Sequence, residues 1–219
     1  MNGLGSMSDQ DRRGRGRPAD RDSSVTRQKL LDAARECFGE FGFYKTSNNE
    51  IVDRAGVTTG PLYHHFGSKS GLYGAVADDS IEKVFGHLES VLTEQGESHI
   101  IDRLGALLRT VAELHSSDES LARFDAIGPL EIRRNPDLVE HIDPSQLARM
   151  NGLFASVVES AVANGELNSS VAADTLSHLI TVLYFGLIYY CAVMMLDVDP
   201  EEVVDAIMAG LTGALFRPS

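Results

Sequence analysis

The sequence predicts an all-α protein, because its apolar residues recur at helical spacing and Gly, Pro and Asn breaks divide it into segments of helix length. No stretch alternates strictly between apolar and polar residues, as a half-buried strand would. A composition of 43% hydrophobic and 23% charged residues is typical of a globular chain. We expect helices at about 23–42, 46–55, 58–66, 68–92, 98–116, 119–134, 144–164, 171–196 and 200–216.

The first 22 residues differ from the rest, since they hold five arginines among Gly, Asp and Ser and few apolar side chains. Such a segment cannot bury enough surface to order itself, so we predict a disordered basic arm over residues 1–22. Within it, Arg15-Gly16-Arg17-Pro18 is the R-G-R-P core of an AT-hook, in which two arginines enter a narrow A·T minor groove. The alternative is a solvated tail that touches phosphates loosely. Residues 1–10 lack the pattern of a secretory signal, which favours a cytoplasmic location.

The formal net charge of −13 argues against nucleic-acid binding only if the charge is spread evenly. Residues 1–70 carry 11 Lys and Arg against 9 Asp and Glu, whereas residues 71–219 carry 8 against 23. The chain therefore joins a slightly basic N-terminal part, which is compatible with DNA, to an acidic remainder. Cys37 and Cys191 lie far apart in apolar surroundings, so we expect two reduced thiols.

Residues 46–66 have the pattern of a helix-turn-helix: a capped helix, a turn centred on glycine and a short second helix that exposes polar groups early. Ser47 and Glu50 have the spacing of a capping box, and Gly56 supplies the turn. The Thr58 hydroxyl is placed to cap the second helix. Pro61 is tolerated in the first turn of that helix, where amides have no intrahelical partner.

With its flanks, this motif resembles the TetR family of bacterial regulators, whose pattern runs AGVS-x-G-x-LY-x-HF-x-SK-x-x-L. The matching residues are Ala55-Gly56-Val57-Thr58, Gly60, Leu62-Tyr63, His65-Phe66, Ser68-Lys69 and Leu72. Pro61 and Ser70 depart from the pattern, where a small polar residue and Glu are more usual. The resemblance covers about residues 25–78. It implies a helix-turn-helix DNA-binding domain at 23–69 and a helical ligand-binding and dimerisation domain at 70–219.

The resemblance also implies roles for single residues, because phosphate contacts fix the position of a reader on DNA and base contacts fix the sequence it reads. We expect phosphate contacts at the start of the first motif helix and along one side of the second, where helix N-termini favour anions. The candidate residues nearest the bases are Thr59, Gly60, Pro61 and His64. The DNA-contacting residues that we predict are Arg15, Arg17, Thr46, Ser47, Thr58, Thr59, Gly60, Pro61, Tyr63, His64, His65 and Lys69.

Other interpretations of these residues stay open. Phe66 ends the apolar side of the short helix, which favours a core position, and Tyr63 has the same alternative. His64 and His65 suggest a metal, but neighbours on a helix diverge by about 100° and no carboxylate or thiol stands at ligand spacing, so we predict no metal. The chain has no GxSxG, P-loop, HExxH or GxGxxG motif, so we predict neither catalysis nor a cofactor.

Residues 179–196 form an uncharged run of 18, which is long enough to suggest a membrane span. Acidic residues follow it, no Lys or Arg anchors either end, and tyrosines interrupt it, so we predict no membrane partner. A helix that is apolar on all sides is instead buried between its own domain and a second subunit. The resemblance implies a homodimer through the last two long helices and pseudo-palindromic double-stranded DNA as its partner.

A pocket for a small-molecule effector follows from the resemblance alone. Its candidate lining consists of adaptable Met and aromatic side chains of the acidic part, for each of which plain core packing is the alternative. These residues are Phe124, Met150, Phe154, Tyr184, Tyr189 and Met194. We expect an apolar or aromatic effector that releases a repressor from its operator. The alternative function is an architectural DNA-binding protein without an inducer.

Overall fold

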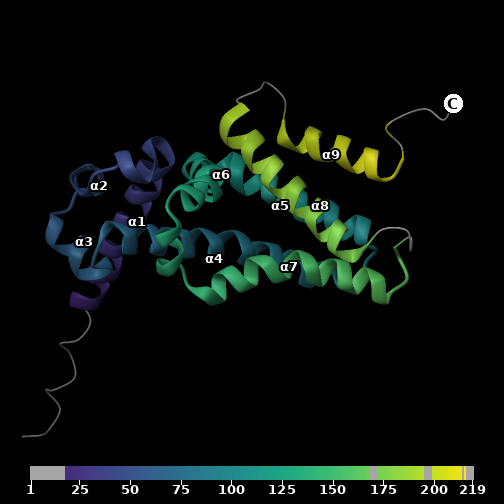
Figure 1. The fold of residues 1–219 in the computed structure, drawn as a ribbon, viewed down its shortest axis with the longest axis horizontal. Coiled ribbons are helices and arrows are strands. Elements are labelled where there is room, and N and C mark those ends of the chain that lie inside the picture. The colour runs from purple at the N-terminus through teal and green to yellow at the C-terminus, as the bar shows by residue number, and fades with distance from the viewer. Residues whose placement is uncertain (1–17, 168–171, 195–198, 214, 216–219) are drawn as a thin grey trace, which may run out of the picture.

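The computed structural model describes residues 18–167, 172–194, 199–213 and 215, and every regular element in these ranges is a helix (Figure 1). The all-α prediction is therefore confirmed. In chain order the elements are α1 (Pro18–Lys45), α2 (Asn48–Ala55), α3 (Thr59–Phe66), α4 (Lys69–Gln95), α5 (Ile100–Ser117), α6 (Glu119–Arg134), the 3-10 helix η1 (Pro136–His141), α7 (Pro144–Ala163), α8 (Ala173–Tyr189), the π-helical turn η2 (Tyr190–Met194) and α9 (Pro200–Leu211). We call α1–α3 the head, which lies at one end of the molecule, and α4–α9 the body (Figure 1).

The first helix begins at Pro18 and not near Ser23, so the predicted disordered arm was too long at its C-terminal side. Proline fits the first turn of a helix, where the missing N–H has no intrahelical partner in any case. Within the next two turns, the Thr26 hydroxyl donates to the Asp22 carbonyl at 2.8 Å. The two residues are four apart, which is helical spacing. Arg15 and Arg17 lie outside the described residues.

Gly42 ends the regular part of α1, as the sequence predicts. Its φ of 77° and ψ of 168° lie in a region that side-chain-bearing residues avoid. A Cβ atom at this position would also lie 3.2 Å from Glu131 Oε1 of α6. The Phe43 amide donates to the other oxygen of the buried Glu131 carboxylate at 3.1 Å, so α6 holds the end of α1.

The core of the head extends into the body. Phe38 and Phe43 of α1, Tyr73 of α4 and Phe124 of α6 form one aromatic cluster, with ring centroids 5.2–5.9 Å apart. All four rings are buried, and Leu72 of α4 packs with them. The first turns of α4 and the middle of α6 therefore belong to the same packed unit as the helix-turn-helix. A second core lies among α4, α5, α7 and α8.

η1 was not predicted, and the backbone at its end closely approaches α4. A Cβ atom at Gly74 would lie 2.0 Å from the carbonyl oxygen of His141. This carbonyl belongs to backbone and cannot swing aside as a flexible side chain does, so only glycine fits at position 74. This contact packs η1, which connects α6 to α7, directly against α4.

Replacing Gly74 by Ala therefore destabilises the protein, whereas the same change at Gly86 in the same helix does not. The clash at Gly74 lowers the free energy of unfolding by about 1–3 kcal/mol or more, as overpacking does. A Cβ at Gly86 meets only side-chain atoms at 3.7 Å, and alanine adds about 1 kcal/mol of helix propensity. Urea denaturation of both variants tests this; equal stabilities would contradict the close approach.

Candidate nucleic-acid interface and effector cavity

The first helix of the motif starts at a complete capping box, as predicted. The Glu50 amide donates to Ser47 Oγ at 3.2 Å, and the Ser47 amide donates to Glu50 Oε2 at 2.7 Å. The hydrogen bond from the Ser47 amide is the main cause that lowers the pKa of the Glu50 carboxyl. Ser47 is exposed, and its hydroxyl keeps a proton that it can donate to a phosphate. Gly56, with φ 66°, then turns the chain toward α3.

α3 presents one apolar and one polar side. Leu62 is fully buried in the head core, and Phe66 is half-buried against it, as expected for its core alternative. Tyr63 and His64 are exposed, and a Cβ at Gly60 would meet nothing within 4 Å. Thr59, Pro61 and His65 are half-buried beside them. The Thr58 side chain makes no capping hydrogen bond, so this detail of the prediction was wrong.

Asn48 is a functional candidate that sequence reasoning missed. Its Nδ2 donates to the Tyr63 hydroxyl at 3.0 Å and so joins the start of α2 to α3. The hydroxyl of Tyr63 accepts this bond and keeps its own proton for donation. Asn48 thus fixes the direction in which Tyr63 offers a hydrogen bond. The sequence shows an amide side chain in the first turn of α2, but it does not show that this amide meets Tyr63 of α3.

Thr46 does not have the phosphate-binding role predicted for it. Its side chain is only 1% exposed, and its hydroxyl lies 2.8 Å from the Gly42 carbonyl oxygen and 3.0 Å from that of Cys37. These carbonyls lie near the end of the regular part of α1, and the Gly42 carbonyl also accepts from the Thr46 amide at 3.3 Å, so Thr46 closes the end of that helix. The prediction was wrong because spacing alone does not reveal which carbonyl oxygens a hydroxyl will meet.

Lys69 is also occupied within the protein. Its ammonium donates to the carbonyl oxygens of Phe43 and Thr46, both at 2.9 Å, and lies 4.5 Å from the centre of the Phe43 ring. Burial lowers the pKa of this ammonium. Two of its three donors are thus used to tie the start of α4 to the end of α1. One donor remains and the side chain is only half-buried, so the phosphate contact of Lys69 stays a prediction beside this structural role.

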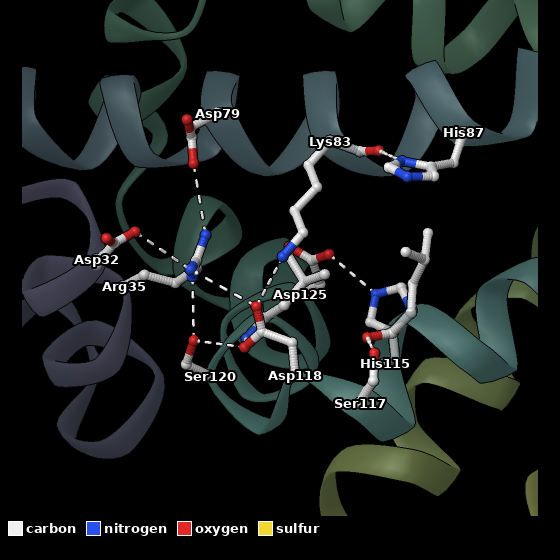
Figure 2. Close-up of polar contacts among 12 residues, drawn as sticks. Asp32, Arg35, Asp79, Lys83, His87, His115, Ser117, Asp118, Ser120 and Asp125 are labelled. Carbon is white, nitrogen blue, oxygen red and sulfur yellow. Dashed lines mark hydrogen bonds and ion pairs between the residues drawn. The ribbon is translucent and has the colours of Figure 1, made fainter. Parts of the chain in front are cut away.

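A buried guanidinium connects the head to the body (Figure 2). Arg35 of α1 has a side chain only 10% exposed, and its Nε donates to Ser120 Oγ of α6 at 3.1 Å. It pairs with Asp79 of α4 at 3.4 Å, Asp118 at the start of α6 at 3.6 Å and Asp32 of α1 at 3.4 Å. One cation therefore joins three helices.

Asp118 is the main anion of this cluster. Burial on its own would raise the pKa of Asp118, but hydrogen bonds from Lys83, Ser120 and the Leu121 amide, with Arg35 nearby, hold it far below its usual range. Lys83 Nζ lies 2.8 Å from Asp118 Oδ2 (Figure 2). Because this folded-state pKa is depressed, the stabilisation is complete above the ordinary carboxyl pKa and is lost only as pH falls toward the folded value.

The body contains a cavity of about 100 Å³ between α4, α6, α7 and α8. Of the predicted lining residues, Phe124, Met150 and Tyr184 do line it. Phe154 lines a second pocket, between α7 and α8, together with Met150, and its ring also packs against those of Phe85 and Tyr184. Tyr189 and Met194 are about half exposed on the outer side of the molecule, so their assignment to the pocket was wrong. A helix apolar all round gives no sign of which side faces inward.

A capped helix, a glycine turn and a short helix with an exposed polar side, set on a helical body, define a helix-turn-helix transcription regulator. Residues 30–76 match the family described as bacterial regulatory proteins, tetR family. The repressor KstR2 of Rhodococcus jostii (strain RHA1) is 30% identical to the chain over 163 residues, which are 72% of this chain and 76% of that protein. The chain therefore belongs to the TetR family, and it is a DNA-binding transcriptional regulator.

Two further comparisons agree with this assignment. The regulator UidR of Escherichia coli (strain K12) is 23% identical over 182 residues, which are 83% of this chain and 86% of that protein. The crystal structure of FadR from Bacillus subtilis in complex with stearoyl-CoA superposes with a TM-score of 0.73 at 17% identity, covering 86% of this chain and 99% of that chain. The structural likeness extends the shared fold over both head and body.

The exposed residues of α3 differ in the effect expected on DNA binding. We predict that the Tyr63 hydroxyl donates to a phosphate, so Tyr63→Phe should lower the affinity for every duplex about fivefold and keep the sequence preference. We predict that His64 lies near base edges, so His64→Ala should change the free-energy preference among bases by about 1–3 kcal/mol at one position of each half-site. Fluorescence anisotropy with a panel of duplexes measures both.

His87→Ala is the matched control for the histidine variant, because His87 is exposed on α4, outside the helix-turn-helix. Its Nδ1 lies 2.6 Å from the Lys83 carbonyl oxygen of the same helix. The variant should leave both affinity and preference unchanged. An equal loss of sequence discrimination in Tyr63→Phe and His64→Ala would refute the two separate roles.

Proposed function

We propose that the protein is a homodimeric repressor that leaves a pseudo-palindromic operator when a small ligand fills the body cavity. The observation that carries this proposal is that α4 and α6 wall the cavity and also hold α1 through Arg35. A ligand that displaces either wall therefore acts on the head. A DNA-binding regulator of this kind works in the cytoplasm, as the sequence also suggests.

On both α4 and α6, one residue contacts Arg35 and a nearby residue lines the cavity. On α4, Asp79 binds Arg35 while Ser80 and Ile81 line the cavity. On α6, Ser120 binds Arg35, and Phe124 lines the cavity one turn later. A shift of these helices by a ligand changes the geometry around Arg35 directly.

A second connection runs through the other end of α6. Glu131 accepts a hydrogen bond from the Phe43 amide at the end of α1, and the next residue, Ile132, lines the cavity. Between these points, a Cβ at Gly39 of α1 would lie 3.1 Å from the Phe124 backbone nitrogen, so the two helices touch along their backbones. α6 therefore contacts α1 near both of its own ends and at a point between them.

Such a device works as a population shift. The ligand favours a form in which the two α3 helices of the dimer no longer match the spacing of the operator half-sites. A coupling of about 1–3 kcal/mol, which is typical of allosteric proteins, changes operator affinity by about 5- to 150-fold.

The size of the cavity sets a limit on the effector. FadR from Bacillus subtilis was solved with stearoyl-CoA, a long acyl chain on a large polar carrier. The cavity of this chain, about 100 Å³, is smaller than the ~150 Å³ cavity that encloses benzene in a protein core. We therefore propose a compact effector for this chain.

The proposed dimer uses α8 and α9. Residues Ala173–Met194 form the one candidate membrane span among the described residues, with a mean hydropathy of 1.7. Ile180, Tyr184 and Ile188 on one side of this helix are buried in the body core, whereas Leu179, Val182 and Tyr189 are exposed. A helix with one side in a core and the other apolar suits a second copy of the chain better than lipid.

Val182→Asp tests this interface, because Val182 is 67% exposed in the single chain. A buried, unpaired carboxylate at a two-fold interface is costly, so the variant becomes a monomer in sedimentation velocity. Its affinity for a two-half-site operator falls by about 10² or more, since the second half-site no longer adds to binding. Val162→Asp on α7, at 53% exposure, is the control and stays dimeric. A dimeric Val182→Asp variant would disprove this interface.

Selection of duplexes from a random pool tests the function as a whole. A repressor of this geometry selects a symmetric consensus, with half-site centres one helical turn or a small multiple apart, about 10–10.5 base pairs per turn. Random DNA should compete about 10³ to 10⁷ times more weakly than the consensus. A pool without a symmetric consensus, together with equal competition by random DNA, would support the architectural alternative instead.

A further inference from the structure

We propose that the body cavity binds a small uncharged molecule consisting of one apolar ring with a hydroxyl group, as in phenol, and that the hydroxyl pairs with Ser80. This inference deepens the proposed function, because it rests on the cavity being the effector site. It commits to one chemical class and excludes carboxylates and phosphates.

The walls of the cavity select an apolar ring. Aliphatic and aromatic side chains from four helices line it, among them Ile81 and Phe85 of α4, Phe124 of α6, Met150 of α7 and Phe185 of α8. Its volume of about 100 Å³ compares with ~150 Å³ for a cavity that holds benzene. One ring therefore fits with a small adjustment of the walls, and the Met150 side chain is flexible enough to supply it.

Ser80 provides the polar partner. It is 2% exposed, it lines the cavity, and its hydroxyl has no hydrogen-bond partner in the described part of the chain. A buried hydroxyl without a partner is unfavourable, and an incoming hydroxyl removes that cost. A ligand with a hydroxyl thus gains from Ser80 what a bare hydrocarbon ring does not.

Asp125 determines the charge that the cavity accepts. It is the one charged side chain among the described lining residues, and its Oδ2 lies 3.1 Å from Nε2 of the buried His115 (Figure 2). The other ring nitrogen of His115 lies 2.8 Å from the Val111 carbonyl oxygen, which only accepts, so Nδ1 carries a proton. Asp125 thus already has a hydrogen-bonding partner within the protein.

Because Asp125 already contacts His115, the cavity offers a ligand no unpaired charge. An anionic ligand meets the carboxylate of Asp125 and no cation, because no Lys, Arg or His is among the described lining residues. A cationic ligand gives up its hydration without gaining an unpaired anion. An uncharged ring with one hydroxyl gives up less hydration than either ion, and it gains the hydrogen bond to Ser80.

Isothermal titration of the purified full-length protein with four probes tests this selectivity: phenol, benzene, benzoate and benzylamine. Phenol should bind about fivefold more tightly than benzene, which is the gain from one hydrogen bond. Benzoate and benzylamine should bind at least about tenfold more weakly than phenol. Tighter binding of benzoate or benzylamine than of phenol, or no binding of phenol, would overturn the proposal.

Ser80→Ala identifies the partner. The substitution removes an unpaired buried hydroxyl, so the variant should fold at least as stably as the parent. It should bind benzene as before and lose the preference for phenol. Ser156→Ala, at a helical serine whose hydroxyl donates to the Leu153 carbonyl and which does not line the cavity, is the control and keeps the preference. An unchanged preference in Ser80→Ala would refute the role of Ser80.

Measuring operator binding in the same samples separates this inference from the proposed function. Phenol binding with the predicted selectivity but unchanged operator affinity would uphold the site and reject the switch. A symmetric operator from the random pool with no phenol binding would uphold the DNA reader and reject the site.

Discussion

The arrangement of the whole molecule depends on the charge of Arg35. A guanidinium with a 10% exposed side chain has to be paired, because an unpaired buried charge is very costly. Its partners are carboxylates and a hydroxyl on α1, α4 and α6, and these are the groups that place the head against the body. The direction of α3 follows from that placement, since α3 packs on α1 and α4. The cavity follows as well, because α4 and α6 form two of its walls.

α6 is the element in which these constraints meet. One side of it lines the cavity through Phe124 and Ile132, and another side contacts α1 through Ser120, through the backbone beside Gly39 and through Glu131. Close-packed interiors transmit displacements because they have little empty space to absorb them. In the proposed switch, α6 is therefore the element through which a change at the cavity would reach α1.

The motif was predictable from the sequence, because the capping box at Ser47 and the turn at Gly56 are local features. The start of α1 at Pro18 and the helix η1 were not. The roles of Thr46 and Lys69 were not, because both side chains bind carbonyl oxygens at the end of α1, which spacing does not bring into view. Arg35 carried one signal: it lies four residues after Leu31 and three before Phe38, on the apolar side of its helix. A charge at such a position indicates buried partners, but only the fold reveals which ones.

The cations around the helix-turn-helix fall into two groups. Arg35 is paired with carboxylates, Arg54 lies 3.2 Å from Glu40, and Lys69, at the start of α4, donates to carbonyl oxygens. Arg27, Lys29 and Lys45 of α1 are instead exposed. Counterion release scales with the number of phosphates that cations neutralise. The salt dependence of DNA binding by the described head therefore depends on how many of these three exposed cations reach phosphates, whereas hydroxyls such as those of Ser47 and Tyr63 add contacts without adding to it.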